Sequence, residues 1–158
     1  KDLCFDDRGE PIVIYLTCGG PEPGPENGPH QWWIASRAHG EWTHTKITVS
    51  DHAYDHGELA QVAPDDWRLL APTGVCVDRW GTGGEMHLWQ SRDRGRTWTD
   101  LGAKTDDQQS YTYARRPRHA HPDFAWLFSD GRANLPAPST LHFADIDGNI
   151  TRMPPTLP

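Results

Sequence analysis

Short runs of apolar residues, separated by turn-forming residues, recur along the whole chain. Runs of this length, bounded by glycine, proline and acidic residues, are typical of β-strands. The stretches Pro11–Tyr15 and Met86–Arg92 show the pattern well. No stretch repeats its apolar residues with the period of about 3.6 that an amphipathic helix requires. The pattern therefore predicts an all-β chain.

The predicted strands fall into three groups that repeat one unit. Corresponding points recur about 55 residues apart, slightly above the ~40–50 residues of a propeller blade. The expected strands are 3–6, 11–15, 32–37 and 42–44 in the first unit, 58–62, 67–70, 86–92 and 98–99 in the second, and 113–116, 124–128, 141–145 and 150–151 in the third.

Four strands per unit is the make-up of a β-propeller blade. We predict three blades, at approximately 1–49, 50–105 and 106–158. Three blades do not close a ring, because propellers have about four to eight. We therefore expect the chain to be the C-terminal part of a longer one whose remaining propeller blades complete the ring. The alternative is an oligomer that completes it.

Residues 91–98 read Ser-Arg-Asp-Arg-Gly-Arg-Thr-Trp and fit the pattern S-x-D-x-G-x-T-W at every fixed position. Ser91 and Asp93 are expected to hydrogen-bond the backbone of a tight turn, and Gly95 to supply a positive φ. Arg94 and Arg96 are expected to be solvated. The pattern is known as the Asp-box, or bacterial-neuraminidase repeat. It indicates an architecture and not a reaction.

Composition and charge narrow the classes of partner. The net charge of -7 argues against nucleic acid, which requires a basic face. No apolar run approaches the ~20 residues of a membrane helix, so no membrane partner is expected. Three cysteines at positions 4, 18 and 76 have neither zinc-site spacing nor an even number. No metal site is predicted, and the sequence names no cofactor.

Beyond the Asp-box, further stretches resemble the neuraminidase-like propellers of the sialidase superfamily, with bacterial-neuraminidase (BNR) repeats of the fourth type. These stretches are 24–29, 51–57, 82–85, 113–117, 120–124 and 148–154. Relatives of that family include ulvan lyases and rhamnose-releasing enzymes that act on acidic polysaccharides. The resemblance implies a carbohydrate-active propeller of seven blades, with an acidic poly- or oligosaccharide as its partner and an extracellular or periplasmic location.

Propeller geometry sorts the candidate site residues. Loops between the second and third strands of a blade, and crossings from one blade to the next, share one face. The candidates for catalysis on this face are Tyr15, His30, His52, Tyr54 and His56, and those for substrate binding are Arg79, Trp80, Tyr113 and Arg115. Resemblance makes Tyr15 the best match to the family's catalytic tyrosine. His30 stands where relatives often carry an arginine, so the chain departs from the family's pattern at this position.

Lyase chemistry on a uronate explains the choice of residue types. An arginine neutralises the carboxylate, a base removes the acidified proton, and an acid protonates the departing oxygen. Arg79 or Arg115, together with tyrosine and histidine, supplies these types. The structural alternatives are a packed tyrosine and histidines, such as His52 and His56, that cap turns. Trp80 could stack on a sugar ring.

Three functions are therefore weighed. The leading one is an enzyme on acidic polysaccharide, either a lyase or a glycosidase. The second is a carbohydrate-binding or structural propeller without catalysis, and the third is a protein-interaction propeller. Because the early histidines of the related lyases would lie outside this segment, we expect the segment alone to be inactive.

Overall fold

The computed structural model describes residues 2–53, 56–131 and 138–154. Tyr54, one of the predicted catalytic residues, lies outside them. The described chain forms three four-stranded antiparallel sheets, each built from consecutive strands. The first contains β1 (Asp2–Phe5), β2 (Pro11–Thr17), β3 (His30–Ala38) and β4 (Glu41–Ser50). The second contains β5 (Glu58–Gln61), β6 (Trp67–Pro72), β7 (Met86–Ser91) and β8 (Thr99–Ala103).

The third sheet contains β9 (Ser110–Arg115), β10 (Trp126–Gly131), β11 (Leu141–Ala144) and β12 (Ile150–Arg152). The predicted all-β architecture of three four-stranded units is thereby confirmed. Several strand boundaries differ from the predicted ones, and two of the differences concern aromatic residues. Phe124 belongs to a single 3₁₀ turn, η1 (Pro122–Phe124), whose proline favours a turn over a strand, and Trp98 precedes β8 instead of opening it. No helix in the described ranges could span a membrane.

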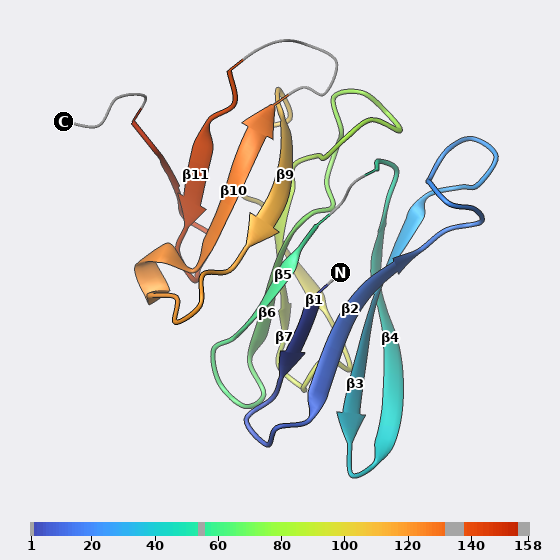
Figure 1. Cartoon of the computed structure of the whole chain (residues 1–158), viewed down its shortest axis with the longest axis vertical. Coiled ribbons are helices and arrows are strands. Elements are labelled where there is room, and N and C mark those ends of the chain that lie inside the picture. The colour runs from blue at the N-terminus through green and yellow to red at the C-terminus, as the bar shows by residue number, and fades with distance from the viewer. Residues whose placement is uncertain (1, 54–55, 132–137, 155–158) are drawn as a thin grey trace.

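The sheets pack face to face in chain order, like neighbouring blades (Figure 1). Between the first two sheets lies a cluster of buried side chains from both: Ile12, Ile14, Trp32 and Ile34 from the first, and Leu59, Trp67, Leu69 and Ala71 from the second. These residues alternate with more exposed ones along β2, because successive side chains of a strand point to opposite faces. The apolar residues that alternate along the sequence of β2 therefore form part of the interface between the first two sheets.

The second sheet is buried on both faces. Its other face contributes Leu70, Met86 and Leu88 to a cluster with Tyr111, Trp126 and Phe128 of the third sheet. A strand covered on both sides needs apolar residues at successive positions. That explains the nearly continuous burial of β6, in contrast to the alternation in β2.

The first strands of the sheets lie side by side where the sheets converge. The amide of Leu59 in β5 donates to Asp2 in β1 at 3.2 Å, and Gln61 donates to the carbonyl of Phe5 at 2.6 Å. The amide of Arg116, directly after β9, donates to Glu58 at 2.5 Å. β1, β5 and β9 therefore line the inner side of a fan, as expected for the first strands of propeller blades.

The 91–98 turn has the expected hydrogen bonds. The Ser91 hydroxyl accepts from the amide of Gly95 at 2.8 Å, and Asp93 accepts from the amide of Thr97 at 2.9 Å. Gly95 has a φ of 83°, and an added Cβ would lie 2.9 Å from the Trp67 ring. Both geometry and space therefore require glycine here.

Arg94 was expected to be solvated, which is wrong. It donates to Asp6 at 3.0 Å and to Asp7 at 2.9 Å, so it joins the 91–98 turn of the second sheet to the β1–β2 turn of the first. A guanidinium suits this position because its planar fork reaches two carboxylates at once.

Candidate functional site

Loops of one rim are joined by backbone hydrogen bonds. The amide of Trp80 donates to the carbonyl of Asp51 at 2.8 Å, and the amide of Ala53 donates to that of Gly81 at 2.6 Å. Gly84 and Tyr111 exchange two further bonds. The crossing 51–57, the β6–β7 loop and the start of β9 are thus held together, as propeller geometry predicted for this face. We call this side of the molecule the loop rim.

Three of the predicted residues meet at the inner edge of this rim. The rings of His56 and Tyr113 are stacked, with centroids 5.2 Å apart and an interplanar angle of 25°. Nη2 of Arg115 lies 3.5 Å from Nδ1 of His56. His56 comes from the crossing that precedes β5, whereas the other two come from β9. We call these three residues the rim cluster.

The backbone at Tyr113 is unusual and explains how its ring reaches His56. Tyr113 has a φ of 58°, and the register between β9 and β10 shifts at this point. Such an irregularity inserts an unpaired residue and re-aims its side chain, and it is frequent beside functional sites. A positive φ is also costly for a bulky residue. Tyr113 remains 46% exposed, so burial of this residue does not offset the strain.

Glu58 adds an acid beside the rim cluster. Burial raises the pKa of the Glu58 carboxyl, and the charge of Asp2 raises it further, against the lowering effects of the Arg116 amide and of the Arg115 and Arg116 charges. Nη1 of Arg116 is buried and has no hydrogen-bond partner among the described residues. A buried donor of this kind is normally satisfied by water or a ligand. Sequence reasoning missed Glu58, although its place directly after the crossing was a usable signal.

A second group of predicted residues forms a pocket on the loop rim. Arg79 pairs with Asp51 at 3.0 Å, and its guanidinium lies 5.0 Å from the centre of the Trp80 ring. The pocket has a volume of about 460 Å³ and is also lined by Ser50 and Thr73. Its lining comes from the end of β4 and from the β6–β7 loop, among other residues. An indole with adjacent polar groups is suited to a sugar ring, which needs an apolar face and hydrogen bonds together.

Tyr15 lies apart from the rim cluster. Its neighbour Ile14 packs against the second sheet, so by alternation Tyr15 is on the opposite face of the first sheet. There its hydroxyl lies 3.0 Å from Nδ1 of His44, and its ring stacks on Trp33 with centroids 6.5 Å apart. His44 was not among the predicted site residues. A Tyr–His pair of this kind can exchange a proton, but on a different surface from His56.

Two of the predicted catalytic histidines, His30 and His52, are buried in this structure. His52 is 0% exposed, and its Nε2 lies 3.2 Å from the carbonyl oxygen of Gly74. His30 is 8% exposed, on the side of β3 that faces the second sheet. The structural alternative, an imidazole that binds backbone, describes His52.

The described residues contain no group of three or more metal-ligating side chains close enough to hold an ion. The Cys4 thiol is not a ready nucleophile or metal ligand either, because it is protonated. Burial raises the pKa of Cys4 to about 12, with smaller contributions from nearby carboxylates, so its thiol is protonated at neutral pH. The rim cluster and Glu58 together offer imidazole, phenol, guanidinium and carboxyl groups for chemistry.

The three packed sheets belong to the class of β-propeller blades. Two solved structures share the fold. Both are of an ulvan lyase described as a new family of polysaccharide lyase, PL25, one of them bound to -[GlcA(1-4)Rha3S]-. Each superposes with a TM-score of 0.71 over 97% of this chain at 17% sequence identity, and the chain spans 33% of the length of each. No protein-family model and no curated protein matches the sequence.

Proposed function

We propose that this chain forms part of a carbohydrate-active propeller and binds an acidic oligo- or polysaccharide at the rim cluster. The observation that carries the proposal is the position of Arg115 beside His56 and Tyr113 on an exposed inner edge. A guanidinium is the preferred partner of a carboxylate, and aromatic rings offer a face to a sugar. The shared fold with a lyase bound to a glucuronate-containing oligosaccharide supports the same class of ligand.

The reaction that these residues suit best is β-elimination at a uronate. Arg115 would pair with the carboxylate and so increase the acidity of the adjacent C–H. His56 or the Tyr113 phenolate would take that proton, the C–O bond to the departing sugar would break, and a C=C bond would form in the uronate. Glu58, whose raised pKa keeps more of it protonated, is suited to give a proton to the leaving oxygen.

The rest of the proposed ring would come from further blades of the same protein. The matched neighbours are about three times as long as this chain, since it covers 33% of each. In this proposal the pocket at Asp51, Arg79 and Trp80 contacts other sugars of the same polymer on the loop rim. An extracellular or periplasmic location would fit a polymeric substrate.

The binding proposal is tested by calorimetric titration with a glucuronate oligosaccharide and its uronate methyl ester. Tighter binding of the free acid is expected, and Arg115→Ala should remove that preference. Arg118→Ala is the matched control, since Arg118 is an exposed arginine in the turn between β9 and β10. Equal affinity for acid and ester, or equal loss in both variants, would contradict the proposal.

Binding without turnover is the second candidate, favoured by the burial of His30 and His52 and by the separation of Tyr15 from His56. Ultraviolet detection of an unsaturated uronate, the product of a lyase, distinguishes a lyase from a module that only binds. We expect this chain alone to bind without releasing that product. Release that depends on His56 and Tyr113 in a protein with the full ring would establish the lyase. Absence of product there, with binding retained, would establish the binding module.

A further inference from the structure

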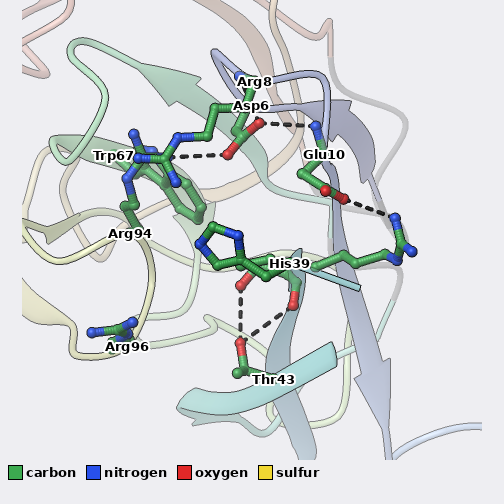
Figure 2. Close-up of a pocket in the computed structure, with 11 residues that line it drawn as sticks. Asp6, Arg8, Glu10, His39, Thr43, Trp67, Arg94 and Arg96 are labelled. Carbon is green, nitrogen blue, oxygen red and sulfur yellow. Dashed lines mark hydrogen bonds and ion pairs between the residues drawn. The ribbon is translucent and has the colours of Figure 1, made fainter. Parts of the chain in front are cut away.

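A second pocket, drawn in Figure 2, lies at the strand ends opposite the loop rim. Three tight turns form it: the β1–β2 turn, the β3–β4 turn and the 91–98 turn. The residues that line it are Asp6, Arg8, Glu10, Ser36, Arg37, Ala38, His39, Thr43, Trp67, Arg94 and Arg96. Four arginines thus converge here, in a chain with a net charge of -7.

Both carboxylates in the pocket are already neutralised by two of the arginines. Asp6 accepts from Arg94 at 3.0 Å, and it also accepts from the amides of Arg8 and Glu10. Glu10 pairs with Arg37 at 3.0 Å. Figure 2 shows these contacts along one wall of the pocket. The acids therefore hold the turns in place and leave the other two arginines uncompensated.

The guanidinium groups of Arg8 and Arg96 make no ion pair or hydrogen bond with any residue that the structure describes. They approach from different turns and lie on different sides of the pocket, with the His39 ring between them (Figure 2). His39 is held there by a two-residue hairpin turn, in which it and Gly40 have φ values of 53° and 87°. A histidine accepts the left-handed conformation more readily than most side chains.

The pocket has a volume of about 100 Å³, which leaves room for a small anion. One wall is the edge of Trp67, which is 1% exposed and lowers the local access of water.

We propose that this pocket binds a tetrahedral oxoanion, the sulfate or phosphate group, either free or as an ester on a larger molecule. A planar carboxylate is matched by a single guanidinium fork, whereas donors that approach from two sides match oxygens spread around a tetrahedral centre. Arg8 and Arg96 line the pocket from two different turns, on either side of His39, and the pair at Arg94 and Asp6 joins those turns. The site is independent of the rim cluster and of the activity proposed for it.

The test is titration of the chain with sodium sulfate and sodium phosphate at constant ionic strength, followed by NMR of the arginine side chains. Saturable binding is expected, with Arg8 and Arg96 signals shifted. The Arg8→Gln/Arg96→Gln variant should weaken binding about tenfold or more, since charge-assisted hydrogen bonds are lost. Arg92→Gln is the matched control, because Arg92 is exposed in the same 91–98 turn but does not line the pocket.

Non-saturable shifts, or an equal effect of Arg92→Gln, would overturn the proposal. Unfolding midpoints within error of the wild type show that the variants remain folded. A sulfated oligosaccharide and its desulfated form then distinguish the source of the anion. Tighter binding of the sulfated form than of free sulfate supports an ester ligand, and equal binding supports the free ion. Arg115→Ala should leave sulfate affinity unchanged, so failure here and failure at the rim cluster are separable.

Discussion

The imidazole of His56 and the phenol ring of Tyr113 lie stacked, with centroids 5.2 Å apart. One residue belongs to the crossing between the first two sheets, and the other to the first strand of the third sheet. The stack therefore joins segments of two blades at the inner edge of the loop rim, and Arg115 adds a positive charge to it. This arrangement is the basis of the saccharide-binding proposal.

The strain at Tyr113 gives the first prediction. Because its φ is 58°, glycine should fit the backbone better than any other residue. We expect Tyr113→Gly to be more stable than Tyr113→Ala by about 1 kcal/mol. Both variants should lose affinity for the acidic saccharide. Urea unfolding and calorimetric titration measure the two effects. Equal stability of the two variants would show that the conformation carries no strain.

Glu58 should make the stability of the chain depend on pH. A raised pKa in the folded state means that the folded chain binds more protons, so stability falls as pH rises above the ordinary glutamate value of 4.5. Glu58→Gln removes this dependence and keeps an acceptor for the Arg116 amide. The unfolding free energy of the variant, relative to wild type, should therefore increase between about pH 4.5 and neutrality. A constant difference across this range would contradict the assignment.

Asp93 should act in the opposite direction. Burial by itself would raise the pKa of Asp93, but hydrogen bonds from Thr97, Ser91 and the Arg96 amide outweigh it and lower the pKa. Its contribution to stability is thus present above the unfolded-state pKa and is lost as pH falls through the folded one. Asp93→Ala should cost about 1–3 kcal/mol at neutral pH and less in acid. Asp65→Ala, at an exposed turn position, is the control and should cost little.

The Arg94–Asp6 pair should contribute more to stability than the Arg37–Glu10 pair in the same pocket. The side chains are 26% and 9% exposed in the first pair, but 41% and 26% in the second. Solvent screens the more exposed pair. Double-mutant cycles of glutamine and asparagine variants should give a coupling of about 1–2 kcal/mol for the first pair and below about 1 kcal/mol for the second. The reverse order would show that Arg94 does not clamp the two sheets.

The strands could be predicted from the sequence because successive side chains of a strand point to opposite faces, which leaves a local pattern of apolar and polar residues. Ile12 and Ile14 alternate with exposed neighbours along β2, and a strand is the structure that places such residues on one face. The 91–98 turn was predictable for a similar reason, since Ser91 and Asp93 bond backbone groups within a few residues.

The site was harder to predict because it depends on contacts between segments far apart in the chain. Nothing local shows that Tyr15 faces away from the second sheet or that His52 is covered by the β6–β7 loop. Glu58 was read as an ordinary strand residue, since its pKa is raised by burial between packed sheets and by the charge of Asp2 in another sheet. The bulge at Tyr113 likewise arises from the pairing of β9 with β10.

The most direct test of the central claim is an NMR titration of the chain with a glucuronate oligosaccharide, with backbone and aromatic signals assigned. We predict saturable shifts at His56, Tyr113 and Arg115, and their loss in Tyr113→Gly. Shifts confined to the face of the first sheet that carries Tyr15, or no saturable shift at the rim cluster, would contradict the account.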